Sequence, residues 1–165
     1  TGMQSSFFED MVAEVLALTG EDSPVKVRRV LRNSCMLSSD VSAAYDPLYP
    51  EVFEKKNTAY FGRGLVLNKY TGSRGKNGTS DANAEYVAKV RNVFDNNHVA
   101  FQTAELGKVD QGGGGTIAYV MANKAMSVID SGVAVLSMHA PYEVTSKSDV
   151  YEVYRGYKAF LKDMK

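Results

Sequence analysis

Short apolar runs and amphipathic helical stretches alternate along almost the whole chain of 165 residues, and this alternation constrains the fold more than any other feature. The runs "CMLSS", "GLVLN", "VAFQT" and "VAVLSM" have the length of strands. Between and after them, apolar residues recur every three or four positions, most clearly in residues 150–164. Strands that alternate with helices pack in layers, so the sequence predicts an α/β fold rather than a helical bundle or an all-β sandwich.

Four local patterns give further expectations. The glycine-rich, basic stretch "TGSRGKNGTS" predicts a loop, and the helical pattern that follows it predicts an N-cap at Ser80 or Asp81. Ser6 and Glu9 have the spacing of a capping box at the start of the first helix. Cys35 lies in an apolar run, which predicts a place in the core.

The composition gives no support for several classes of partner. Lys plus Arg and Asp plus Glu both total 19, so the zero net charge does not favour nucleic acid or an anionic membrane surface. No apolar stretch approaches the roughly 20 residues that a membrane span needs. The single cysteine excludes a disulfide within the chain and indicates a reducing compartment, for which the cytoplasm is the expectation.

Two apolar runs end on side chains that bind metal ions. Asp40 follows "CMLSS" and His139 follows "VAVLSM". Ligands of α/β proteins gather outside the carboxyl ends of the strands, and carboxylate and imidazole groups together suit a divalent metal such as zinc. Taken alone, each residue also has an ordinary structural explanation, because Asp40 fits a cap or turn and His139 fits a half-buried, hydrogen-bonded histidine.

The run "QGGGG" before "TIAYV" places several backbone N–H groups at the expected start of a helix. Such a place can hold an anion, a carboxylate or an oxyanion. The run does not match a dinucleotide fingerprint, because that motif needs the spacing G-x-G-x-x-G directly after a strand. The other explanation is a flexible connection.

Five collinear segments resemble one family over nearly the whole chain. The segments "TGMQSSFFEDMVAEV", "SSDVSAAYDPLYPE", "KYTGSRGK", "GGGGTIAYVMANKAMSVIDSG" and "LSMHAPYE" are similar to the metallo-aminopeptidases of the aspartyl aminopeptidase and vacuolar aminopeptidase I family. The resemblance implies that Asp40 and His139 bind a pair of divalent metal ions, with zinc the first candidate and cobalt or manganese the others. It also implies that Glu143 braces the site from behind.

The resemblance implies peptide substrates and a substrate-facing surface. Gly114, Gly115 and Thr116 are expected nearest the substrate, as a wall of backbone. Lys69 falls near the substrate-facing lysine of members that prefer acidic N-terminal residues. Those members carry a histidine three residues after the metal-binding aspartate, where this chain has Ala43, so a neutral or hydrophobic N-terminal residue is as well supported as an acidic one.

The resemblance also implies a three-layer α/β/α sandwich of the zinc-exopeptidase type, which is incomplete here. Residues 1–165 correspond to the C-terminal portion of the catalytic domain. The N-terminal half, with an earlier histidine, a bridging aspartate and a pair of glutamates that includes the general base, lies outside this sequence, and so does the dimerisation domain. The family assembles as a closed homo-oligomer.

The function expected from the sequence is therefore that of a fragment of a dinuclear metal-dependent aminopeptidase. On its own, the fragment is expected to be catalytically inactive and nearly free of metal, because each ion would have one ligand from this chain and zinc requires three or four. Two alternatives stay open. One is a non-catalytic homologue, and the other is an anion- or nucleotide-binding α/β domain built on the glycine loop that runs from Gly112 to Gly115.

Overall fold

The computed structural model describes residues 2–21, 23–74, 77–108, 111 and 113–164. Its helices alternate with strands, as the sequence predicts. In chain order the elements are η1 (Gly2–Gln4), α1 (Phe7–Leu18), α2 (Pro24–Arg32), β1 (Cys35–Ser39), β2 (Ser42–Ala43), η2 (Pro50–Val52), β3 (Leu65–Asn68), β4 (Tyr70–Ser73), β5 (Asn77–Asp81), α3 (Ala84–Asn96), β6 (Phe101–Thr103), α4 (Ala118–Ala122), β7 (Ser127–Gly132), β8 (Ala134–Leu136), β9 (Val144–Thr145) and α5 (Lys147–Asp163).

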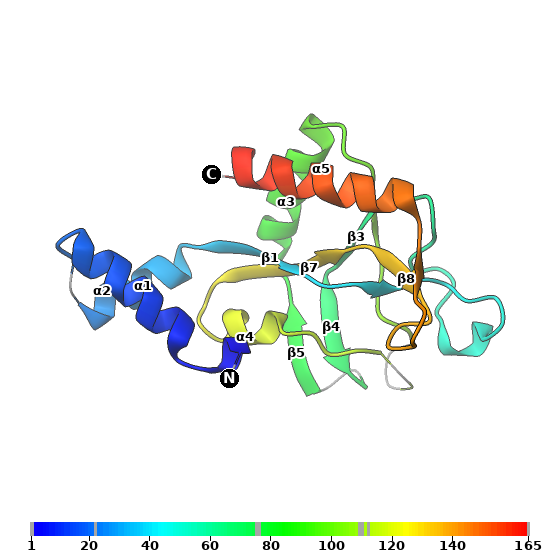
Figure 1. The fold of residues 1–165 in the computed structure, drawn as a ribbon, viewed down its shortest axis with the longest axis horizontal. Helices are drawn as coiled ribbons and strands as arrows, with labels where there is room; N and C mark the ends of the chain where they lie inside the picture. The colour runs from blue at the N-terminus through cyan, green and yellow to red at the C-terminus, as the bar shows by residue number, and fades with distance from the viewer. Residues whose placement is uncertain (1, 22, 75–76, 109–110, 112, 165) are drawn as a thin grey trace.

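Within the described residues, a mixed sheet with the strand order β1-β7-β3-β6 forms the middle layer. Strands β1 and β7 are parallel, β3 and β6 are parallel, and β3 runs antiparallel to β7. Helices α3 and α5 cover one face of this sheet, and α4 with the β4–β5 hairpin covers the other (Figure 1). The layered α/β architecture expected from the sequence is confirmed.

Strand β7 is buried on both faces, although its sequence "SVIDSG" combines two apolar residues with polar ones. Ile129 packs in the cluster formed with α3 and α5, whereas Val128 packs against α4 on the opposite face. Successive side chains of a strand point to opposite faces, so one strand supplies both cores. Strand β7 therefore lies between the two hydrophobic clusters, and packing on both faces holds its residues in place.

The β1–β7 pair continues into a smaller sheet in which β2, β8 and β9 follow one another. Asp40 lies at the junction, where its N–H donates to Ser131 O at 3.3 Å. A Cβ atom on Gly132 would lie 1.6 Å from the carbonyl oxygen of Asp40. Glycine is required at this position because the backbone after β1 crosses directly over it.

Helix α5 is fixed to the rest of the fold by a buried carboxylate in its first turn. Asp149 is 1% exposed and accepts hydrogen bonds from the N–H groups of Gly62 and Gly64, both at 2.8 Å. At the next turns of the helix, Tyr157 donates its hydroxyl to Ser131 O at 2.6 Å. The helix is thereby tied both to the segment before β3 and to β7.

The structure corrects four of the local expectations. The stretch expected to be a loop contributes most of strands β4 and β5, which pair antiparallel. Ser80 and Asp81 belong to β5, and the N-cap of α3 is Asn83, whose side chain accepts from Tyr86 N. Cys35 is exposed at the sheet edge and does not lie in the core. The expected capping box is not formed by the side chain of Ser6, because its hydroxyl donates to the carboxylate of Asp10.

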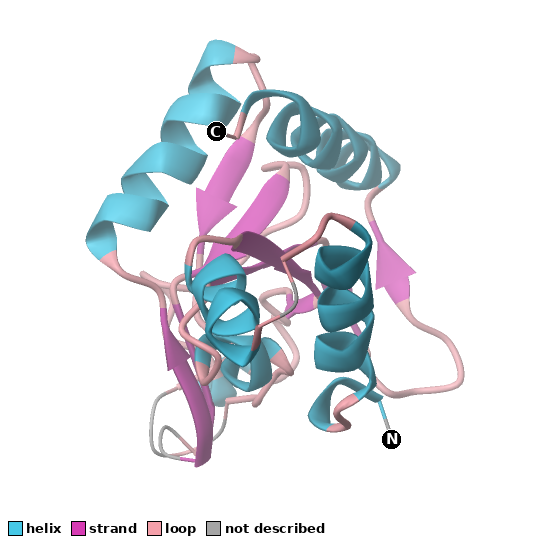
Figure 2. Cartoon of the chain, turned by 90° about the vertical axis from the view of Figure 1, so that its left-hand side faces the viewer, coloured by secondary structure: helices cyan, strands magenta, loops and turns pink. Residues whose placement is uncertain are grey.

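Helices α1 and α2 form a hairpin that projects from the sheet (Figure 1). Figure 2 shows the molecule from the side on which this hairpin lies. No residue of α1 is buried. On its apolar face, Phe8, Val12 and Leu16 are half-buried, whereas Met11 and Val15 are 48% and 57% exposed, so this face is only partly covered by the described residues. Among those residues, no helix is long and apolar enough to cross a membrane.

The close approach at Gly132 gives the first prediction. Replacing Gly132 with Ala is expected to lower the free energy of unfolding by about 3 kcal/mol, at the upper end of overpacking effects, because a backbone atom must move. Gly156→Ala is the control, since its new Cβ would meet the flexible end of Leu65 at 2.7 Å and the change improves helix propensity. Urea unfolding of both variants is the measurement, and equal losses would contradict the prediction.

Candidate metal centre

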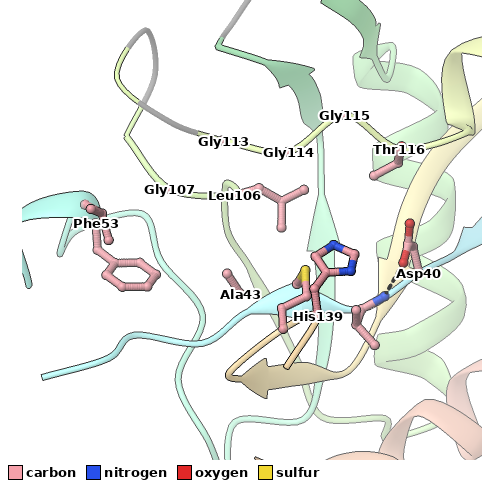
Figure 3. Close-up of a pocket in the computed structure, with 13 residues that line it drawn as sticks. Asp40, Ala43, Phe53, Leu106, Gly107, Gly113, Gly114, Gly115, Thr116 and His139 are labelled. Atoms are coloured by element: carbon pink, nitrogen blue, oxygen red, sulfur yellow. Dashed lines mark hydrogen bonds between the residues drawn. The ribbon is translucent and has the colours of Figure 1, made fainter. Parts of the chain in front are cut away.

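Asp40 stands directly after β1, outside the carboxyl end of the strand. Its carboxylate is exposed, and Oδ1 accepts a hydrogen bond from the N–H of Val41 at 2.8 Å (Figure 3). This bond fixes one oxygen against the chain. In the described residues, no hydrogen bond occupies Oδ2, which is free to bind a ligand.

His139 lies three residues beyond the end of β8, in a turn with unusual backbone angles. Ser137 and His139 have φ values of 57° and 68°, in the left-handed region that side chains rarely adopt. Two hydrogen bonds hold the turn, one from Ala140 N to Ser137 O at 2.9 Å and one from His139 N to Glu143 Oε1 at 2.6 Å. Strained backbone that is held in this way is common where a side chain must be aimed at a ligand.

The two side chains face one pocket, although they are 99 positions apart in sequence. The pocket has a volume of about 460 Å³, and both Asp40 and His139 line it. Figure 3 shows the imidazole and the carboxylate on the same side of the cavity, below the glycine-rich segment. The parallel pairs β1–β7 and β2–β8 bring them there, because both chains leave the sheet at the same edge. Their role as metal ligands stays a prediction.

The opposite side of the pocket is a wall of backbone, residues 113–116, which we call the glycine wall. Gly113 has a φ of 82°, and the carbonyl oxygen of Gly114 accepts from Gly72 N at 3.1 Å. Gly114, Gly115 and Thr116 all line the cavity, and their contact with a substrate stays a prediction. Gly112, which belongs to the loop of the anion-binding alternative, lies outside the described residues.

Beneath the glycine wall lies a buried carboxyl group that the sequence did not single out. Asp130 of β7 is 3% exposed, and its Oδ2 accepts from Thr116 Oγ1 at 2.9 Å and from Thr71 Oγ1 at 3.0 Å. Burial raises the pKa of this carboxyl above its usual range, the hydroxyls of Thr116, Ser38 and Thr71 oppose that shift, and the negative charge of Asp40 adds to it. Within the described residues, Oδ1 has no hydrogen-bond partner.

Glu143 and Lys69 occupy different places relative to the pocket. Glu143 contacts the site through the backbone N–H of His139 and not through the imidazole. Lys69 pairs with Asp81 across the β4–β5 hairpin and is not among the residues that line the pocket. The structure therefore brings together Asp40, His139 and the glycine wall, with Glu143 behind them, and leaves Lys69 outside that cluster.

The donor atoms fit part of a divalent metal site. A carboxylate oxygen and an imidazole nitrogen are suitable zinc ligands, but zinc takes four ligands in most protein sites and keeps at least three from the protein in catalytic ones. In the part of the chain that the structure describes, no three His, Cys, Asp or Glu residues are grouped closely enough to hold a metal ion. Asp40 and His139 would therefore need ligands from elsewhere in a longer protein.

The rest of the pocket is apolar. The segment after β2 supplies Val52 and Phe53, the segment after β6 supplies Leu106, and Met138 precedes His139. Ala43 of β2 also lines the cavity. Apart from the two candidate metal ligands, no charged residue among the described ones lines this cavity.

Comparisons with known proteins identify the family. Residues 1–161 match the family described as aminopeptidase I zinc metalloprotease (M18). The chain belongs to the M18 family. A probable M18 family aminopeptidase 1 of Clostridium acetobutylicum is 61% identical over 163 residues, which are 99% of this chain and 35% of that protein. Vacuolar aminopeptidase 1 of Saccharomyces cerevisiae is 31% identical over 84% of this chain and 26% of its own length.

Solved M18 structures have the same fold. The aminopeptidase from Thermotoga maritima superposes with a TM-score of 0.92 at 44% identity, covering 98% of this chain and 36% of the other. The aminopeptidase I from Clostridium acetobutylicum gives a TM-score of 0.86 at 61% identity, covering 98% of this chain and 34% of the other. The chain thus spans about a third of the length of these M18 relatives.

Asp130 was missed because its signal lies in spacing that only the fold makes visible. In the sequence "SVIDSG" it follows only two apolar residues and precedes a serine and a glycine, so it resembles the polar end of a strand. A charged residue in the middle of a strand that is buried on both faces is unusual, since buried carboxylates are costly without partners. That local conflict was the available clue.

The contact between Glu143 and the turn of His139 gives the second prediction. In the full-length M18 protein, Glu143→Ala is expected to weaken metal binding about tenfold, in the range seen for groups that orient ligands, because the turn loses its brace. Glu143→Gln keeps an acceptor oxygen and is the matched control, expected within about twofold of the wild type. Competition with a chromophoric zinc chelator measures both, and wild-type affinity in the alanine variant would contradict the role.

Proposed function

We propose that this chain is the C-terminal part of the catalytic domain of a metal-dependent aminopeptidase, which removes the N-terminal residue from peptides. The observation that carries the proposal is the convergence of Asp40 and His139 on one pocket opposite the glycine wall. Membership of the M18 family, described as zinc metalloproteases, supports it. Because the chain spans about a third of its relatives, the activity belongs to the longer protein.

In this proposal Asp40 and His139 each give one ligand to a site for two divalent metal ions, with zinc as the first candidate. When bound, such ions supply Lewis-acid chemistry that polarises a peptide carbonyl and a nucleophilic water. The residues of this chain hold the metal ligands in place and orient the substrate. The strand ends fix the ligands, and Gly114, Gly115 and Thr116 face the substrate backbone. The general base and the other ligands come from the N-terminal half of the domain.

The pocket favours an apolar N-terminal residue as the preferred substrate. Phe53, Leu106 and Met138 offer apolar surface next to the candidate ligands. A substrate carboxylate placed against this surface would lose its hydration without gaining a cation, which is costly. Lys69, the lysine that could have met such a charge, is paired with Asp81 outside the pocket.

The protein is further proposed to act as a cytoplasmic homo-oligomer. The exposed apolar face of α1, with Met11 and Val15 about half exposed, supports burial against further protein. One solved relative with the same fold, from Saccharomyces cerevisiae, is a dodecamer. The unpaired Cys35 supports a reducing compartment.

The activity is tested on the protein expressed from the intact gene. Release of N-terminal leucine from a peptide is expected to stop on full chelation and return with zinc. Asp40→Asn and His139→Gln are expected to lower kcat/KM at least about a thousandfold, since each removes a ligand that the reaction needs. Lys69→Gln, which lies outside the pocket, is the control and is expected to keep wild-type activity.

Activity that survives both chelation and Asp40→Asn would refute the metal-dependent aminopeptidase, and loss of activity only in Lys69→Gln would contradict the assignment of Asp40 and His139 as ligands. A folded full-length protein without any peptidase activity would favour the non-catalytic homologue. The anion-binding alternative has weaker support, because the helix after the glycine run, α4, has only five residues. Titration calorimetry with nucleotides tests that alternative, which requires a measurable heat of binding.

The apolar pocket gives the fourth prediction. The full-length enzyme is expected to prefer N-terminal leucine over glutamate by about a hundredfold in kcat/KM, which corresponds to the cost of stripping water from an unpaired charge. Ala43→His places a titratable cation at the half-buried position beside the pocket and is expected to narrow that ratio at pH 6. Ala43→Leu, of similar bulk without charge, is the control, and an unchanged ratio in the histidine variant would count against the assignment of this surface.

A further inference from the structure

Asp130 stands out among the groups that the proposed reaction does not use. It is a carboxyl group in the middle of the sheet, 3% exposed, without a basic partner among the contacts of the described residues. Stability alone would favour a neutral side chain at such a place, because a buried carboxyl loses its hydration. A contribution to the stability of the core therefore does not explain why an aspartate occupies this position.

The hydrogen bonds of Asp130 lead to the glycine wall. Its Oδ2 accepts from Thr116 Oγ1, and Thr116 also accepts from Ala118 N at 3.2 Å, at the start of α4. The preceding residues of the wall have no side chains beyond hydrogen, so they cannot anchor themselves by packing. The wall is also held by the hydrogen bond from Gly72 N to Gly114 O and by a 3.4 Å contact between the hydroxyls of Thr71 and Thr116.

The strand that carries Asp130 also positions the candidate ligand Asp40. Ser131 O accepts from Asp40 N, and Gly132 touches the Asp40 carbonyl group. Three consecutive residues of β7 thus contact the two sides of the pocket. Asp130 holds the wall, and the next two residues hold the chain segment that carries the ligand.

We propose that Asp130 is a positioning residue for this site: through Thr116 it keeps the glycine wall at a fixed distance from Asp40, so that a peptide is held between backbone and metal. The inference rests on the proposed aminopeptidase function. Asp130 touches neither the substrate nor the metal ions, and it acts through Thr116. The second hydroxyl on the same oxygen, that of Thr71, fixes the rotation of the carboxyl group and ties it to β4.

The test uses the full-length protein with three variants. Thr116→Val removes the hydroxyl with little change of volume, and Asp130→Asn replaces the oxygen pair by an amide. Thr58→Val is the control, because the buried hydroxyl of Thr58 has no hydrogen-bond partner among the described residues and Thr58 does not line the pocket. Amide hydrogen exchange of residues 113–118 is followed by mass spectrometry, zinc content is measured for each protein, and kcat and KM are determined separately with an N-terminal leucine substrate.

The expected result is about tenfold faster exchange in the wall and about a tenfold higher KM for Thr116→Val and Asp130→Asn, at unchanged zinc content, with Thr58→Val like the wild type. A wall displaced by less than 1 Å suffices for such an effect. A role confined to stability would lower the melting temperature or the zinc content and leave exchange in the wall and the KM of zinc-loaded protein unchanged, and that result would overturn the proposal.

The comparison of Thr116→Val with the control variant tests the proposal even if Asp130→Asn does not fold. Wild-type exchange and wild-type KM in Thr116→Val overturn the proposal. An inactive wild-type protein would refute the aminopeptidase function, and the exchange comparison would still decide whether Asp130 holds the wall. Failure of the proposed function and failure of this inference are thereby distinguishable.

Discussion

The fold depends on the close contact between β7 and the chain that leaves β1. Parallel pairing of the two strands brings Ser39 opposite Ser131, and one residue later the Asp40 carbonyl group lies directly over Gly132. No side chain fits in that space. This contact sets the direction in which both chains leave the sheet, and with it the place where Asp40 and His139 meet. The pocket is a consequence of backbone packing before any ligand is considered.

Around that contact, rigid and adaptable parts of the pocket are separated. The candidate ligands follow the ends of the short strands β1 and β8, whose backbones are held by pairing with β7 and β2. The wall opposite them is built of glycines, which have no packing of their own and rely on Thr116, Gly72 and the buried carboxyl beneath. The apolar surface comes from three separate segments, so its shape can differ between relatives without disturbing the ligands.

Much of this arrangement could be predicted from the sequence, because it depends on periodicity and on where apolar runs stop. The layered fold and the ends of β1 and β8 follow from such patterns, whereas the substrate-facing place of the glycines was expected only from the family resemblance. The β4–β5 hairpin could not be predicted, since its residues are polar and glycine-rich and pairing between strands overrides weak local propensity. Lys69 was placed in the site by analogy with relatives, whereas its contact with Asp81 depends on that same hairpin. The role of Asp130 can be recognised only in the folded chain, where β7 lies next to β4 and the glycine wall.

Strand β1 is the outermost strand of the sheet among the described residues, and one side of its backbone is unpaired. Cys35 and Ser39 are exposed along it, and neither a charged side chain nor a proline protects this strand. An edge of this kind is a template for adding a foreign strand. When the 165 residues are produced alone, self-association through this edge is therefore an artefact to design against. The size of such aggregates would carry no information about the quaternary structure of the natural protein.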